Sequence, residues 1–496
     1  MAPLSLLDCP KEVQLGITEL LLQADAANLS MTCRALHNLA ERHVYSTIQI
    51  TWSRQYYPPI PQILRLIRTL LDRRDLGNIV RSIEFGGNGF IDYDDPPWPG
   101  ETPEPPELPS LPLEKLAAHI QRFGVSEPSV DEWMSKVLYS DAYRYLDFDD
   151  NHDLGVIQKT QSATCDAAAA TVVSLLPSLE RLSVTDNWYN KARLLGLVLR
   201  VAFCGTNRDS TGNSLPTFAA LKYVSAEPNI YDNTNLNPNK VDEDLCLFYL
   251  PCIQYLSTGV QNPTRFSWPC ASAPNPVSLT SLELFRLREI HLGHILSATK
   301  NLKKLRYNWF YRSDMDKDIS KDIVMLDTMA NALLEVKDSL EELEINAETH
   351  PAIATGEYEP PDVEFLGSMK KLHGMHKLKS LYILWSFITG MKGSSTGPGL
   401  IGAAMPPNIE HLNLCGQLMW SQEEEYELDH DETIIEAFTR ELERGALSHL
   451  NSLKSISLPQ SVYRDGMPEA CEDKMRALGY RFRLAISSPR RKIEDF

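Results

Sequence analysis

The stretch Leu340-Glu-Glu-Leu-Glu-Ile345 places apolar residues at its first, fourth and sixth positions. The same L-x-x-L-x-apolar pattern occurs nine times between residues 179 and 458, each time after a helical stretch and a small polar break. Self-similarity of this kind is the sequence signature of a repeat architecture. An earlier copy covers residues 80–85. The central residues of the nine copies are Leu182, Leu221, Leu256, Leu282, Leu305, Leu343, Leu381, Leu412 and Ile456.

Each copy predicts one β-strand of a repeat. Side chains alternate between the two faces of a strand, so the fourth and sixth residues point to the same side. One strand and one helix cannot bury an apolar face alone, so successive units should stack. The steps between central residues range from 23 (Leu282 to Leu305) to 44 (Leu412 to Ile456). We therefore predict an α/β fold that resembles an irregular leucine-rich-repeat solenoid. The alternative is a set of separate strands in an ordinary α/β domain.

Other segments predict further strands, helices and loops. Alternation of polar and apolar residues predicts a first strand over 46–52, and another strand is predicted over 78–85. Eight prolines predict an exposed insertion over 96–112, and the acidic stretch 421–432 predicts a solvated loop. Helical patterns cover 63–71, 113–123, 131–139 and 163–176.

Residues 4–45 hold three short helical patterns without room for a core of their own. Pro10 is expected as the first residue of the first helix, and Asp25 as the N-cap of the second. About forty residues are marginal as an isolated domain, so an exposed apolar face here predicts a docking surface for a partner. The alternative is three ordinary helices packed on the rest of the chain. The apolar faces consist of Val13, Ile17, Leu20 and Leu21, and of Leu36, Leu39, Ala40 and Val44.

The same segment follows a motif with fixed spacing. It has a Pro-x-Glu opening, an apolar helix, a second helix that starts at an Asp, and Leu-x-x-x-Cys-Arg-x-Leu. This motif resembles an F-box in the form common in fungal F-box proteins. Cys9 stands where the family usually has Leu, which puts a smaller side chain before the proline. The matching residues are Pro10, Glu12, Val13, Ile17, Leu21, Asp25, Leu29, Cys33, Arg34 and Leu36.

The resemblance implies a substrate-recognition subunit of an SCF-type (Skp-cullin-F-box) E3 ubiquitin ligase, which is not itself catalytic. Residues 1–47 would dock on a Skp-type adaptor, and through it on a cullin, while residues 48–496 would bind a protein substrate. The alternative is a leucine-rich-repeat scaffold for protein interactions without a role in ubiquitin transfer. The residues expected to bind the adaptor are Pro10, Val13, Ile17, Leu21, Leu29 and Cys33.

In the predicted solenoid, the strand residues between the leucines point outward on the concave side, where a partner would bind. Two basic residues of one repeat lie one repeat before two acidic ones, which predicts a surface divided by sign that could orient a peptide. Two tryptophans lie four residues after their central leucines and are expected to cluster on one rim as interface anchors. The alternative is that these rings cap the core. The residues expected to contact substrate are Lys304, Arg306, Trp309, Glu342, Glu344, Tyr382 and Trp385.

Composition and motifs argue against other classes of function. The formal net charge of -18 argues against nucleic acid as a partner, and no apolar run approaches the roughly eighteen residues of a membrane span. Nine scattered cysteines without CxxC pairs predict reduced thiols in the cytoplasm or nucleus. The common catalytic and nucleotide-binding motifs are absent from the sequence, so we expect neither an enzyme nor a cofactor. Two histidine pairs, at 291/294 and 373/376, are expected to be packing or surface residues rather than metal ligands.

Overall fold

The computed structural model describes residues 6–52, 59–87, 108–125, 127–138, 166–185, 188, 193–204, 215–226, 244–260, 262–312, 321–350, 363–389, 400–415, 436, 438–445, 447–458 and 469–487. Over these residues the chain is an α/β protein with parallel sheets, which confirms the predicted class. The chain forms two compact units. The first comprises residues 1–235 and 249–253, and the second comprises 236–248 and 254–496.

The sheet of the first unit has four described strands. β1 (Thr47–Thr51) pairs with β2 (Ser82–Gly86), β2 pairs with β3 (Arg181–Val184), and β3 pairs with β4 (Tyr223–Ala226), all in parallel. The strands lie side by side in chain order, as a repeat architecture requires. β1 and β2 confirm the strands predicted over 46–52 and 78–85.

The sheet of the second unit follows the same rule. Its neighbouring strands are parallel and lie in chain order. A separate parallel pair joins β8 (Ile323–Met325) to β10 (Glu364–Leu366). The strands of the larger sheet are β5 (Tyr255–Gly259), β6 (Ser281–Phe285), β7 (Lys304–Arg312), β9 (Glu342–His350), β11 (Ser380–Leu384), β12 (His411–Cys415), β13 (Ser455–Ser457) and β14 (Ala485–Ser487).

The predicted central residues stand opposite one another across this sheet. Each pairs with its counterpart on the next strand, and each is at most 2% exposed. The pattern did not predict β14, whose Ile486 pairs with Ile456 and extends the column. Stacked apolar side chains of this kind form the core of the unit. The column consists of Leu256, Leu282, Leu305, Leu343, Leu381, Leu412 and Ile456.

The copy predicted at residues 218–223 is displaced by three residues. β4 pairs Val224 with Leu182, so Val224 is the central residue of this strand. The assignment of Leu221 as the central residue is therefore wrong. Phe218, Leu221 and Val224 follow one another at intervals of three, so two triplets match the pattern equally well. Only the pairing with β3 decides between them.

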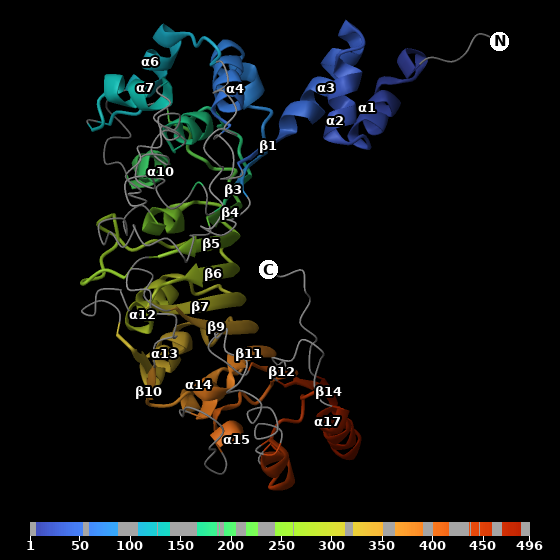
Figure 1. The fold of residues 1–496 in the computed structure, drawn as a ribbon, viewed down its shortest axis with the longest axis vertical. Coiled ribbons are helices and arrows are strands. Elements are labelled where there is room, and N and C mark those ends of the chain that lie inside the picture. The colour runs from blue at the N-terminus through green and yellow to red at the C-terminus, as the bar shows by residue number, and fades with distance from the viewer. Residues whose placement is uncertain are drawn as a thin grey trace, which may run out of the picture. The chain divides into compact units, whose positions relative to one another are not determined.

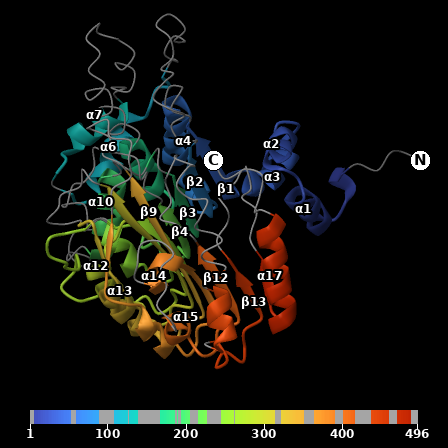
Figure 2. The ribbon, with the colours of Figure 1, turned by 60° about the horizontal axis from the view of Figure 1, so that its bottom comes forward.

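Helices line one face of each sheet (Figure 1). In the second unit α12 (Glu289–Ala298) and α13 (Leu326–Leu333) lie on one side of the strands, and Figure 2 shows α17 (Glu469–Phe482) beside the C-terminal strands, where it packs against β14. None of the described helices is both long enough and apolar enough to cross a membrane. Further described helices of the second unit include η5 (Cys246–Tyr249), η6 (Leu334–Val336), η8 (Lys370–Gly374), α14 (Trp385–Thr389) and α15 (Leu400–Ala404), and residues 438–443 are also helical.

The helices predicted in the first unit are present. α4 (Ile60–Asp72) buries apolar residues spaced by three and four along its length, which is the pattern of a helix packed on a sheet. The segment predicted over 163–176 is helical at 166–174. The remaining helices here are α5 (Arg74–Gly77), α6 (Leu113–Gln121), α7 (Val130–Leu138) and α10 (Arg193–Cys204).

Three short helices precede β1, after the turn η1 (Leu6–Asp8). They are α1 (Lys11–Glu19), α2 (Gln23–Ser30) and α3 (Arg34–Ser46), and both α1 and α2 pack on α3. α3 ends at Ser46 and runs directly into β1, which begins at Thr47.

Two predicted helix starts are wrong. Pro10 is the N-cap of α1 rather than its first residue. Asp25 lies in the first turn of α2, whose N-cap is Leu22. A carboxylate in the first turn interacts favourably with the helix dipole without being the cap, so an Asp in this position marks a helix start only to within a few residues.

Two predicted loops lie outside the described residues. Only residues 108–112 of the proline-rich insertion 96–112 are described, and none of the acidic stretch 421–432 is.

Candidate functional site

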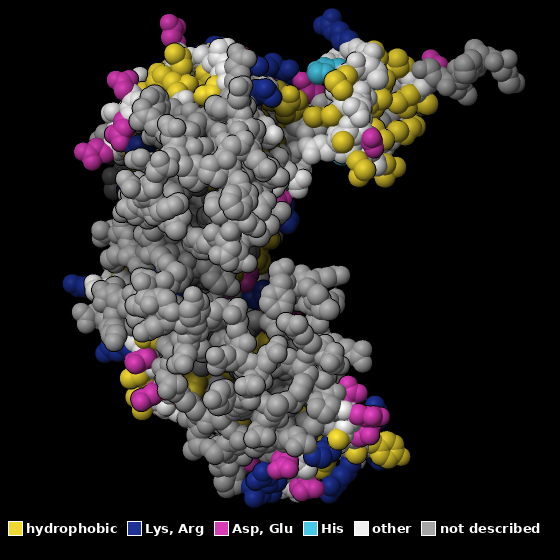
Figure 3. Space-filling model, in the orientation of Figure 1, with side chains coloured by type: hydrophobic (Ala, Val, Ile, Leu, Met, Phe, Trp, Pro, Cys, Tyr) yellow, Lys and Arg dark blue, Asp and Glu magenta, His cyan; other side chains and the backbone are white. Residues whose placement is uncertain are grey.

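The three N-terminal helices carry a surface of exposed apolar side chains. Seven of the twelve exposed large hydrophobic side chains among the described residues belong to residues 6–31. Figure 3 shows these helices covered by yellow apolar side chains. Large apolar side chains that remain exposed in such numbers mark an interaction surface. We call it the N-terminal apolar surface, and its members are Leu7, Val13, Leu15, Ile17, Leu20, Leu22 and Met31.

This surface is exposed because the core between the helices is made mostly of small residues. Thr18, Ala26 and Ala40 are almost fully buried, together with Leu39. Small side chains allow short helices to approach closely, but they leave no room inside for the larger Val, Ile, Leu and Met side chains. The larger side chains therefore face outward.

Side-chain hydrogen bonds hold the helices together. The ring of His43 on α3 contacts the carbonyl oxygen of Leu21 at 2.9 Å, between α1 and α2. The amide of Gln23, the first residue of α2, donates to the carbonyl of Val44 at 2.8 Å. These bonds satisfy backbone groups at helix ends that would otherwise lack partners. The N-terminal apolar surface therefore sits on a defined scaffold.

A cluster of charges connects α3 to the helices that follow β1. The guanidinium of Arg73 lies 3.0 Å from Glu41 of α3 and 2.6 Å from Asp75 of α5. Hydrogen bonds to Asp75 and Glu41 raise the pKa of Arg73, and the bond from Arg73 lowers the pKa of Asp75. The cluster links α3 to α5, which precedes β2.

The predicted adaptor residues lie on these helices, although not all of them face outward. Pro10, Val13, Ile17 and Cys33 are exposed, whereas Leu21 and Leu29 are half-buried. The predicted set omitted Leu7, Leu15, Leu20, Leu22 and Met31, of which Leu22 and Met31 flank α2. Helical periodicity does not extend to positions at helix ends, so it gave no signal for those two.

The larger sheet of the second unit carries a row of polar side chains on the face opposite α12 and α13. Arg306 of β7 lies between two carboxylates, with Nη1 3.0 Å from Oε1 of Glu283 and Nε 2.8 Å from Oε1 of Glu344. Tyr255 donates to Glu283 at 3.1 Å, and Asn346 donates to Glu344 at 2.9 Å. We call these residues, together with Asn308, the central polar network.

The network changes the interpretation of the predicted charged surface. The basic and acidic strands are neighbours, with Lys304 opposite Glu342 and Arg306 opposite Glu344, as predicted. However, Lys304 also pairs with Glu342 at 2.8 Å, so the charges neutralise one another rather than forming two separate halves. Burial lowers the pKa of Arg306, but its bonds and charges from Glu344 and Glu283 outweigh that and raise it.

Tyr382 lies beside this network. It is half-buried on β11 and stands opposite Glu344 in the strand register. Burial, the neighbouring Cys415 and the charge of Glu344 all raise the pKa of the Tyr382 hydroxyl, so it is a neutral group at physiological pH. Burial likewise raises the pKa of the Cys415 thiol to about 12. Neither group is a nucleophile in this environment.

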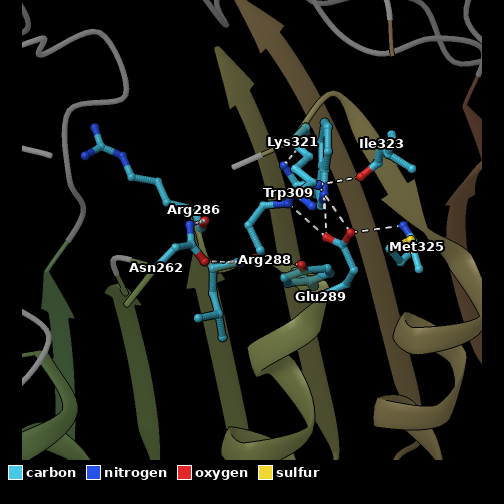
Figure 4. A network of polar contacts seen from close by, with 10 residues as sticks. Asn262, Arg286, Arg288, Glu289, Trp309, Lys321, Ile323 and Met325 are labelled. Carbon is cyan, nitrogen blue, oxygen red and sulfur yellow. Dashed lines mark hydrogen bonds and ion pairs between the residues drawn. The ribbon is translucent and has the colours of Figure 1, made fainter. Parts of the chain in front are cut away.

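Trp309 belongs to a buried polar cluster (Figure 4). Its Nε1 donates to Oε2 of Glu289 at 2.9 Å, and the guanidinium of Arg288 lies 4.6 Å from its ring centroid. Arg288 also pairs with Glu289 at 3.0 Å and donates to the carbonyls of Lys321 and Ile323 at 2.7 and 2.6 Å. The charges of Arg288 and Glu289 are buried and paired with each other, as a buried ion pair requires.

The prediction that Trp309 and Trp385 contact a substrate is wrong, and the alternative that they pack in the core is confirmed. Trp309 is 1% exposed and Trp385 is 2% exposed. The extended β7 turns Trp309 toward Glu289 on α12, while Trp385 begins the short helix α14. In β7, a residue four positions after the central leucine lies on the same face of the strand as that leucine, so Trp309 points into the core with Leu305 and Tyr307.

The histidine pairs take part in packing. His291 contacts the carbonyl of Pro263 at 2.8 Å, and the ring of His294 stacks on Phe266 with centroids 4.7 Å apart. His373 contacts the carbonyl of Met405 at 3.0 Å. Within the described part of the chain no three His, Cys, Asp or Glu side chains gather in an arrangement that could hold a metal ion.

No family model matches the chain, and no curated protein matches it. The N-terminal apolar surface and the central polar network are therefore the features on which a function can be argued.

Proposed function

We propose that the protein is a substrate receptor of an SCF-type ubiquitin ligase. Its N-terminal helices would be an F-box that binds a Skp-type adaptor, and its sheets would be a leucine-rich-repeat-like domain that binds a protein substrate. The receptor itself would act by bringing the substrate close to the enzyme that transfers ubiquitin. The N-terminal apolar surface is the observation that carries the proposal.

The energetics of that surface favour a partner. Full burial of a Val, Leu, Ile or Met side chain stabilises a complex by roughly 1.5–3 kcal/mol before the costs of association. Leu20, Leu22 and Met31 are each at least 74% exposed, so most of that free energy is not used within the chain. A helical scaffold that presents such residues suits a helix-in-groove interface.

The sheets support the second half of the proposal. Strands in chain order with one column of buried leucines are the arrangement expected of stacked repeats. The face of the second unit opposite α12 and α13 presents polar and charged side chains from several strands, including Arg306 and Glu344. An extended surface of this kind can bind a segment of another protein.

Adaptor capture tests the proposal. We expect a purified Skp-type adaptor to capture the wild-type chain, and Ile17→Asp to weaken capture at least about tenfold, because a charge would have to be buried in an apolar interface. Ile290→Asp is the matched control, since Ile290 is also an exposed isoleucine but lies on α12 of the second unit. Failure of the folded wild-type chain to bind would refute the receptor role.

The alternative function is a protein-interaction scaffold without a role in ubiquitin transfer. Addition of a cullin to the adaptor complex separates the two. A ternary complex supports the ligase receptor, whereas adaptor binding that excludes the cullin supports the scaffold.

A further inference from the structure

We propose that the corner formed by Glu344 and Tyr382 binds a lysine or arginine side chain from an extended segment of the substrate. This inference rests on the proposed receptor role and adds the chemical class of residue that the receptor recognises.

The charge balance of the central polar network points to a cationic ligand. Arg306 contacts two carboxylates, Glu283 and Glu344, so the group carries one negative charge more than it carries positive charge. Lys304 and Glu342 pair with each other and leave that balance unchanged. A ligand with a positive charge restores neutrality on this face.

The uncompensated charge is located on Glu344. Its Oε1 receives the bonds from Arg306 and Asn346, while no donor from the described residues reaches its Oε2. The Glu344 side chain is 34% exposed, whereas Glu283 is 10% exposed and is also bonded to Tyr255. A cation arriving from solvent therefore meets an available carboxylate oxygen at Glu344.

Tyr382 supplies the second part of the site. It occupies the strand position opposite Glu344, and its hydroxyl contacts Cys415 on the next strand, so the side chain extends across β11 and β12. An aromatic ring beside a carboxylate attracts a guanidinium or ammonium group by a cation–π interaction as well as by charge. Both components come from neighbouring strands that backbone hydrogen bonds hold in register.

An anionic ligand, such as a phosphorylated side chain, fits this face less well. The two cations that could receive it, Lys304 and Arg306, each already contact a carboxylate at 3.0 Å or less. A phosphate would have to displace those carboxylates and then lie next to them, which adds like-charge repulsion.

A peptide selection tests the proposal. A phage-displayed library of random twelve-residue peptides is selected against the full-length chain, and selected peptides are synthesised for measurement of Kd by fluorescence anisotropy. We expect selected peptides to share a Lys or Arg at one position, and replacement of that residue by Ala to weaken binding about tenfold.

Three variants of the protein test whether the carboxylate of Glu344 binds the cationic residue of the selected peptides. Glu344→Gln should weaken the same peptides about tenfold. Arg306→Met should leave binding unchanged or strengthen it, because it frees both carboxylates. Glu335→Gln should change nothing, since Glu335 pairs with Lys300 outside the sheet.

The opposite results overturn the proposal. Selected peptides that share Asp or Glu, a phosphoserine peptide whose binding Arg306→Met abolishes, or the absence of any enriched peptide would each do so. Adaptor capture by the same preparation is measured separately, so a failure of the peptide site is distinguished from a failure of the receptor role.

Discussion

Nε of Arg306 lies 2.8 Å from Oε1 of Glu344, and the other end of the same guanidinium lies 3.0 Å from Oε1 of Glu283. One side chain on β7 thus connects carboxylates on both neighbouring strands. The pairs are partly exposed, with the Arg306 side chain 51% accessible. Solvent screens such contacts, so they determine the charge pattern of the surface more than the stability of the fold.

The first prediction concerns the stability contribution of Glu344. We expect Glu344→Gln to change the free energy of unfolding by less than about 1 kcal/mol, because partly exposed ion pairs contribute little. Urea denaturation followed by circular dichroism measures this. A loss of several kcal/mol would mean that the residue stabilises the fold, and Glu344→Gln would then be an unsuitable probe of binding.

The second prediction concerns Trp309. We expect Trp309→Ala to destabilise the protein by about 3–5 kcal/mol, since it removes a large buried ring. Trp309→Phe should cost less, roughly 1–3 kcal/mol, because it mainly leaves Oε2 of Glu289 without the indole donor. Urea midpoints of the two variants and the wild type give the comparison. Equal and small effects would contradict the buried position of the ring.

The third prediction concerns pH and His119. This ring is buried against Phe123, and its Nε2 contacts Ser174 at 2.9 Å. Burial, with smaller effects from Arg74 and Arg122, lowers the pKa of His119 to about 4. The unfolded state then binds a proton near pH 6.5 that the folded state does not bind until about pH 4.

Stability from His119 is therefore fully present above pH 6.5 and is lost as the pH falls toward 4. The shift corresponds to at most about 3 kcal/mol. Hydrogen exchange of the helix at 166–174, measured at pH 7 and pH 4.5, follows this loss. His119→Phe removes the titrating group, so the difference between the two pH values should shrink in that variant; an unchanged difference would assign the effect to other groups.

The fourth prediction compares two glycines. A Cβ at Gly77 would lie 2.3 Å from the carbonyl oxygen of Leu175, so Gly77→Ala should destabilise the first unit by about 1–3 kcal/mol. Gly16 lies within α1, and a Cβ added there would meet no described atom within 4 Å, so Gly16→Ala should stabilise the helix by up to about 1 kcal/mol. Thermal melts of the two variants should shift in opposite directions, and a neutral Gly77→Ala would rule out the close contact.

Local patterns in the sequence predicted a large part of the fold. The repeated apolar triplets predicted the strands and the buried central leucines, because strand geometry imposes a period of two. Helical spacing predicted α4, since a helix packed on one side of a sheet buries residues three and four apart. In both cases the signal lies within a short stretch of chain.

The sequence by itself determined the α/β class, the strand in nearly every repeat and the apolar character of the N-terminal helices. Tertiary structure alone decided that Val224 rather than Leu221 stands opposite Leu182, that Trp309 faces Glu289, and that Arg306 is neutralised by Glu283 and Glu344. The physical reason is that burial periodicity is a property of one segment. Register, ring orientation and charge pairing depend instead on which strand or helix lies next to it, and those neighbours are 20 to 42 residues away in the chain.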